Sequence, residues 1–208
     1  VSGFKASVDA IINGQADAAF MSTVTPHAKR LGASPRGIHW PALDPNNKDG
    51  WARMQKAAPY YYPHTATVGA DITADKPLAT GGYPYPILIG NADFNTDTAY
   101  SLTKALVDNY DDYKDKAPGA KGWALSAQKL EWALPYNDGS VKFFKEKGVW
   151  TDAAQKHNDA LIARQDVLAK AWAAFEGSAP SDDGEFRKGW MAARAAALKA
   201  AGMPVIFN

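Results

Sequence analysis

The sequence predicts an α/β fold that continues into a C-terminal helical hairpin. Short apolar segments with β-prone residues alternate with amphipathic helical patterns up to Asn109, which is typical of an α/β lobe. Beyond Asn109 the chain becomes rich in Ala and Lys, and no further strand is evident. Two long stretches with helical apolar spacing then complete the chain, which indicates the hairpin.

Length and composition bound the number of domains. The chain has 208 residues, of which 46% are hydrophobic and 12% aromatic. A domain takes roughly 100 to 200 residues, so the length suits one lobe and part of another. We divide the chain into residues 1–70 (part of a second lobe), 71–150 (a crossing segment and the end of the α/β lobes) and 151–208 (the hairpin).

Charge and cysteine usage argue against several classes of protein. Lys and Arg number 23 against 22 Asp and Glu, and without a basic cluster nucleic acid is a poor partner. Apolar stretches are too short to cross a bilayer. The absence of cysteine excludes disulfides, thiolate zinc sites and cysteine nucleophiles, and it is compatible with an oxidising compartment.

The N-terminal third alternates helix and extended segments. Phe4, Val8 and Ile11 have helical spacing, and Asn13-Gly14 suits the turn that ends a helix. Residues 16–20 then form a short apolar run, which predicts a strand. Thr25 followed by Pro26 predicts an N-cap and the first helical position of the next helix.

The middle of the chain repeats this alternation. Residues 37–40 and 87–89 are strand candidates, and residues 60–68 form a β-prone extended segment. A helix is expected over residues 48–58, and Asn95 or Thr96 caps another.

The expected hairpin consists of helices over residues 151–175 and 185–201. Each has an apolar stripe too wide to leave in water, so the helices should pack together. The expected contact residues are Leu161, Leu168, Trp172, Phe186, Trp190 and Leu198.

The loop between residues 20 and 26 is the most informative candidate site. A loop that leaves a strand and enters a helix presents unpaired N–H groups, which bind carboxylates and phosphates. Ser22, Thr23 and Thr25 add hydroxyl groups, and Val24 lies between them. From the residues alone, an ordinary helix cap without a ligand explains the same pattern.

Aromatic and basic residues supply weaker candidates. Tyr61 and Tyr62 offer apolar area with a hydroxyl and suit a pocket wall, although alternate strand residues face opposite sides and part of this cluster belongs in the core. Arg36 is a candidate counter-ion for a carboxylate, or simply a solvated surface residue.

No motif indicates catalysis, a cofactor or a metal. The four histidines lack metal-ligand spacing, and no nucleophile elbow, phosphate loop or dinucleotide fingerprint is present. We therefore assign no catalytic residue, no metal ligand and no cofactor, and expect a binding protein and not an enzyme. Catalytic residues on separate loops would leave no local trace, so a small hydrolase-like α/β enzyme stays an alternative.

Four blocks of sequence resemble one family, the TAXI-type solute receptors of TRAP transporters. VDAIINGQADAAF (residues 8–20) looks like the family's helix, glycine turn and strand. Three further blocks agree in order with the family: PYYY (59–62), DTAYSLTKAL (97–106) and GSVKFFKEKGVW (139–150). The resemblance covers residues 1–150 and the family's C-terminal two thirds, so its N-terminal lobe is expected before Val1, after a leader peptide that is removed.

The resemblance implies part of a two-lobed periplasmic binding protein fold. Such a receptor closes on a small organic acid in the cleft and delivers it to the membrane permease subunits of a TRAP transporter. The loop from Ser22 to Thr25 occupies the family's position for a cleft loop. Residues 151–208 run past the matched part, and they are expected to pack on the fold or to form a homodimer. A helical protein-interaction module is the remaining alternative.

Overall fold

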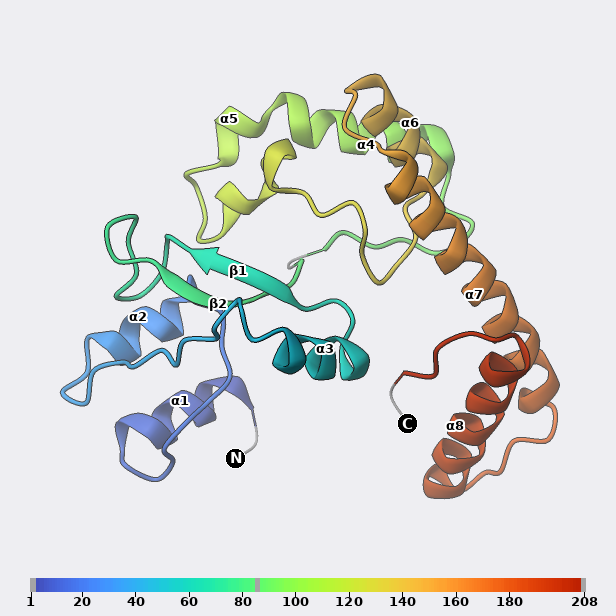
Figure 1. The fold of residues 1–208 in the computed structure, drawn as a ribbon, viewed down its shortest axis with the longest axis horizontal. Coiled ribbons are helices and arrows are strands. Elements are labelled where there is room, and N and C mark those ends of the chain that lie inside the picture. Colours follow the sequence, from blue (N-terminus) through green and yellow to red (C-terminus); the bar gives the residue numbers. More distant parts are fainter. Residues whose placement is uncertain (1–2, 85–86, 207–208) are drawn as a thin grey trace. The chain divides into compact units, whose positions relative to one another are not determined.

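The computed structural model describes residues 3–84 and 87–206 (Figure 1). It is mainly helical, with one small sheet among the described residues, and it is compatible with part of an α/β fold. The strands are β1 (Tyr62–Ala66) and β2 (Leu78–Gly82). The helices are α1 (Phe4–Ile12), α2 (Pro26–Gly32), α3 (Lys48–Ala57), α4 (Thr96–Asp108), α5 (Tyr110–Tyr113), α6 (Asp138–Glu146), α7 (Asp152–Glu176) and α8 (Asp183–Ala200), with short 3-10 helices at Ala120–Trp123 and Leu125–Ala127.

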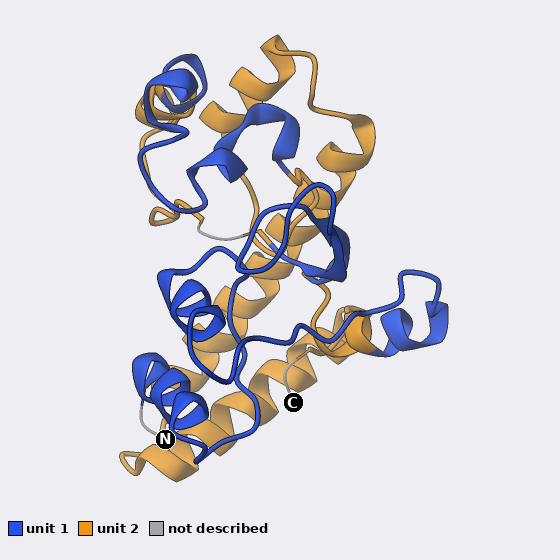
Figure 2. Ribbon diagram, turned by 90° about the vertical axis from the view of Figure 1, so that its left-hand side faces the viewer, with its two compact units in different colours: residues 1–53, 61–83, 106–128 blue, residues 54–60, 84–105, 129–208 orange. Residues whose placement is uncertain are grey.

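The chain divides into two compact units (Figure 2). Unit 1 comprises residues 1–53, 61–83 and 106–128, and it contains α1, α2 and the sheet. Unit 2 comprises residues 54–60, 84–105 and 129–208, and it contains α6, α7 and α8. The boundaries expected at residues 70 and 150 stay a prediction.

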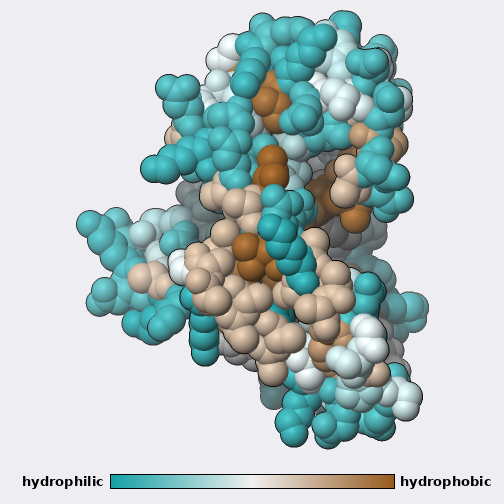
Figure 3. Space-filling model, turned by 90° about the vertical axis from the view of Figure 1, so that its right-hand side faces the viewer, coloured by the Kyte–Doolittle hydropathy of each residue, from teal (hydrophilic) through white to brown (hydrophobic). Residues whose placement is uncertain are grey.

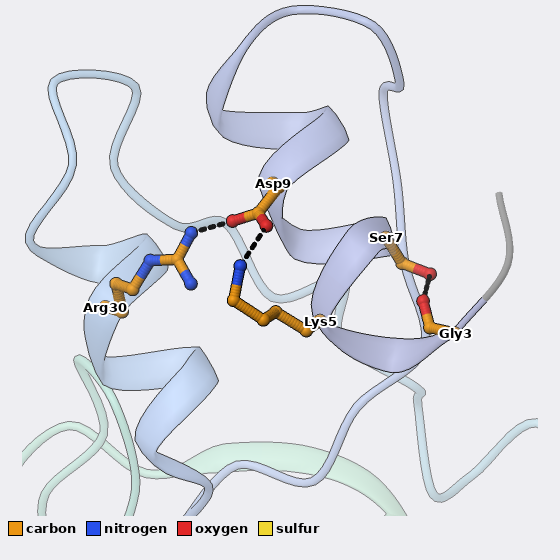
Figure 4. Close-up of polar contacts among 5 residues, drawn as sticks. All are labelled: Gly3, Lys5, Ser7, Asp9 and Arg30. Carbon is orange, nitrogen blue, oxygen red and sulfur yellow. Dashed lines mark hydrogen bonds and ion pairs between the residues drawn. The ribbon is translucent and has the colours of Figure 1, made fainter.

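In unit 1, α1 and α2 share a small apolar core. Val8, Ile11 and Leu31 are buried, and partly buried residues from the end of α1 and from the following loops pack against them: Ile12, Ala16, Ala19, Met21 and Ile38. At the surface the Asp9 carboxylate pairs with Arg30 of α2 and, at 2.7 Å, with the Lys5 Nζ (Figure 4). These ion pairs are partly exposed and stabilise little, so the apolar contacts hold the two helices together.

The three predicted strands at residues 16–20, 37–40 and 87–89 are wrong. All three segments lack regular secondary structure. A strand needs a neighbouring strand to bond its backbone, and in the part of the chain that is described only β1 and β2 pair, antiparallel, from Tyr62 opposite Gly82 to Ala66 opposite Leu78. Residues 16–20 instead contribute Ala16 and Ala19 to the α1–α2 core through their side chains.

The helix signals and one extended segment are confirmed. The segment over residues 60–68 contains β1, and α3 spans the expected helix. At the start of α4 the Asn95 Oδ1 accepts from the Thr98 N–H at 2.9 Å, so Asn95 is the cap. At the end of α1, Gly14 has φ +73°, which a glycine adopts at little cost.

In unit 2, α4 and α6 approach each other closely at Gly139. The hydroxyl oxygens of Thr103 and Ser140 lie 2.8 Å apart, and Phe143 beside them is almost fully buried. Tyr136 packs edge-on against Phe144 and Trp150, with ring centres 5.5 and 5.6 Å apart. These contacts form the core of this part of unit 2.

The C-terminal hairpin is confirmed. In α7 the Trp172 ring lies 5.0 Å from Trp190 and 6.0 Å from Phe186, both in α8, and Leu198 is fully buried. The hairpin faces the viewer in Figure 3, where weakly hydrophobic residues gather among hydrophilic ones. Trp172 and Ile162 remain 37% and 39% exposed, so two helices cannot cover all of the apolar surface they carry.

Candidate functional site

The loop before α2 is first of all a helix cap. The Thr25 Oγ1 accepts a hydrogen bond from the Ala28 N–H at 3.1 Å, and Pro26 takes the first helical position. This is the structural alternative that the sequence offered for Thr25, and it is confirmed. The helix that follows has only seven residues. The Thr25 hydroxyl already has a hydrogen-bond partner inside the protein, the Ala28 N–H.

Thr23 ties the same loop to the segment that follows β1. Its Oγ1 donates to the Val68 carbonyl oxygen at 3.2 Å, and its own carbonyl accepts from the Ala70 N–H at 3.0 Å. A Cβ on Gly69 would lie 2.8 Å from the Thr23 Cβ, so only glycine permits this approach. The Ser22 hydroxyl is half-buried and makes no hydrogen bond to the residues described.

A hollow of about 320 Å³ opens where these two segments meet the loop before residue 120. Its size is at the lower end of small-molecule sites. Among the candidate residues from the sequence, Val24 lines it, whereas Ser22, Thr23 and Thr25 do not. All of its lining residues belong to unit 1: Val24, Lys29, Thr67, Val68, Gly69, Ile72, Thr73, Ala74, Pro118 and Gly119.

Lys29 is the single charged residue in this lining. It is exposed and has no ion-pair partner among the residues described. Its neighbour Arg30 pairs with Asp9, and Asp71 pairs with Lys76 at 3.2 Å. An unpaired ammonium at the edge of an apolar hollow favours an anionic ligand. Lys29 was not predictable from the sequence, because nothing local distinguishes it from other surface lysines.

Tyr61 and Tyr62 lie on different sides of the sheet and do not line the hollow. The Tyr61 ring lies 5.4 Å from Tyr83, which stacks on Phe20 at 6.4 Å. Tyr62 instead lies over Gly82, where a Cβ would come within 2.7 Å of its ring. Burial raises the pKa of Tyr62 above its ordinary value, so its phenol stays neutral at physiological pH.

Arg36 is placed away from the hollow. Its guanidinium lies over the turn after α1, where a Cβ on Gly14 would be 2.9 Å from the Arg36 Nη1. The side chain is exposed. Its assignment as a counter-ion stays a prediction, since no ligand contact tests it.

No group of three metal-ligating side chains is present within residues 3–84 and 87–206. None of the helices in that part of the chain is both long and apolar enough to cross a membrane.

Comparison with known proteins then identifies the family. Neither curated proteins nor solved structures give a significant match to the chain. The model of the NMT1-like family matches residues 1–148, which include α1 to α6 and all three segments that line the hollow. The chain therefore belongs to the NMT1-like family, a periplasmic binding-protein-like family.

Proposed function

We propose that this protein is a periplasmic receptor that captures a small organic acid and delivers it to the membrane permease of a TRAP-type transporter. The match to the NMT1-like family carries the general solute-binding role. The four sequence blocks that resemble TAXI-type receptors support the finer assignment, and one of them ends at the loop that borders the hollow.

The chemistry of this role is binding without reaction. In a two-lobed receptor the lobes close on the solute, and the closed form docks on the permease. The solute leaves unchanged, so the site needs shape, an apolar wall and a charge of the right sign, and no acid–base pair. The hollow beside Val24 and Lys29 offers these features.

Ligand-induced stabilisation tests the proposal. Purified protein is titrated by calorimetry, and its thermal unfolding followed, with a panel of small mono- and dicarboxylates and their neutral amides. We expect at least one acid to bind and, at 100 times its Kd, to raise the free energy of unfolding by about 2.7 kcal/mol. Nuclear magnetic resonance of the mixture should show the acid unconsumed. Turnover of the acid would instead support the hydrolase-like alternative.

A homodimer through α7 and α8 is a further proposal. The hairpin lies wholly beyond the family match, and Ile162 and Trp172 leave apolar surface exposed on it. We expect light scattering to give the mass of a dimer for the full chain and of a monomer for a variant that ends at Gly177. Far-ultraviolet circular dichroism must show that this variant retains its remaining helices. A monomeric full chain would contradict this proposal.

A further inference from the structure

We infer that the solute is a monocarboxylate with an apolar body, and that Lys29 is its counter-ion. This inference rests on the proposed receptor function and names the class of acid and the residue that holds it. The observations behind it are the lining of the hollow beside α2, the charges around it, and the hydrogen bonds made by Thr73 in the lining and by Thr23 in the neighbouring loop.

The wall of the hollow suits an apolar body. Half of its lining residues are aliphatic: Val24, Val68, Ile72, Ala74 and Pro118. Of its two threonines, Thr73 already accepts a hydrogen bond from the Lys76 N–H at 3.1 Å, whereas Thr67 makes none to the residues described. A strongly hydroxylated solute such as a sugar acid would leave its hydroxyl groups facing aliphatic carbon, which costs free energy.

The charge of the hollow suits one carboxylate. Lys29 supplies one positive charge, and no lining residue is acidic. Two acidic residues adjoin the lining in sequence and neither lines the hollow: Asp71 is paired with Lys76, and Asp75 is exposed. A second carboxylate on the solute would find no cation in the lining and would lose hydration without compensation.

The loop hydroxyl groups are poor substitutes for Lys29. The Thr23 hydroxyl donates to Val68, so recruiting it as a donor breaks a bond that holds the loop, and neither Ser22 nor Thr25 lines the hollow. A lysine ammonium, by contrast, offers three donors on a flexible stem and has no competing ion pair among the residues described. Lys29 thus requires no rearrangement of the fold to bind a carboxylate.

The test uses matched ligands to separate the effect of the Lys29 charge from a structural effect of its substitution. The acid 3-methylbutanoate, its neutral amide and the dicarboxylate succinate are titrated into the full chain and into Lys29→Met. The control is Lys48→Met, which removes the same charge from the exposed start of α3. We expect Lys29→Met to weaken binding of 3-methylbutanoate about fivefold, the factor that suits an exposed ion pair. Lys48→Met should leave it unchanged, and the amide should bind both variants equally.

Salt provides an independent readout. Affinity of the unaltered protein for 3-methylbutanoate should fall as ionic strength rises, and that of Lys29→Met should fall much less. If Lys29→Met lost as much affinity for the amide as for the acid, the role of Lys29 would be structural, and the inference would be overturned. Tighter binding of succinate than of 3-methylbutanoate would also overturn the inference. So would a loss of affinity for 3-methylbutanoate in Arg36→Met but not in Lys29→Met. Either result would leave the receptor function intact. If no carboxylate of the panel binds, both the receptor function and the role of Lys29 fail.

Discussion

Replacing Gly139 by alanine should lower the free energy of unfolding by about 3 kcal/mol or more. A Cβ at this position of α6 would lie 2.0 Å from the Thr96 carbonyl oxygen and 2.6 Å from the Tyr100 backbone nitrogen, both in α4. Backbone atoms cannot turn aside as a side chain can, so the two helices must separate. Alanine in a helix otherwise gains about 0.5 to 1 kcal/mol over glycine, and the close contact outweighs that gain.

Thermal unfolding followed by circular dichroism measures this effect. For a chain of this length, a loss of about 3 kcal/mol corresponds to a fall in Tm of about 6 to 12 °C. Gly177→Ala is the matched control, because Gly177 lies in the same unit and a Cβ there has open space around it. It should be neutral or slightly stabilising. Equal Tm values for both variants would show that α4 and α6 do not pack through Gly139.

The helices were predictable because their signals are local. Asn13-Gly14 ends α1, Thr25-Pro26 begins α2, and Asn95 caps α4 within the turn that it starts. The apolar spacing of α7 and α8 likewise extends over many residues, so it identified both helices and their contact through Trp172 and Trp190. Helix caps and apolar periodicity depend only on residues that are close in sequence, so they can be recognised without the structure.

The strands were less predictable because a strand depends on a partner far along the chain. Residues 87–89 have the β-prone composition of a strand, yet Leu88 and Ile89 are 60% and 71% exposed and no described strand lies beside them. By contrast, β2 contains Gly81 and Gly82, and glycine is depleted in strands, so the composition of this segment argues against a strand. Its partner explains Gly82, since the aromatic ring of Tyr62 in β1 occupies the space that a Cβ there would need.

The candidate site was half predictable for the same reason. The loop of residues 22–25 was identified by its hydroxyl groups and cap, and Val24 within it borders the hollow. The opposite walls come from residues 67–74 and 118–119, and no local pattern connects them with this loop. Lys29 acquires its candidate role only because these distant segments surround it.

Filling the hollow with a bulky side chain should abolish solute binding. Ala74 lines the hollow in a loop and is exposed, so Ala74→Trp adds an indole ring there without displacing a buried group. Because the space is only about 320 Å³, the ring competes directly with the solute. We expect calorimetry to show at least a tenfold loss of affinity for any acid that the unaltered protein binds, equivalent to about 1.4 kcal/mol.

Ala42→Trp is the control for adding the same ring elsewhere. Ala42 is also an exposed loop residue of unit 1, but it does not line the hollow. This variant should bind the acid as the unaltered protein does, and both variants should unfold at nearly the same temperature, since surface substitutions change stability by about 0.5 kcal/mol or less. Full affinity in Ala74→Trp would place the solute outside this hollow. Lys29 would then lose its role, because the space beside it would hold tryptophan while the acid still bound.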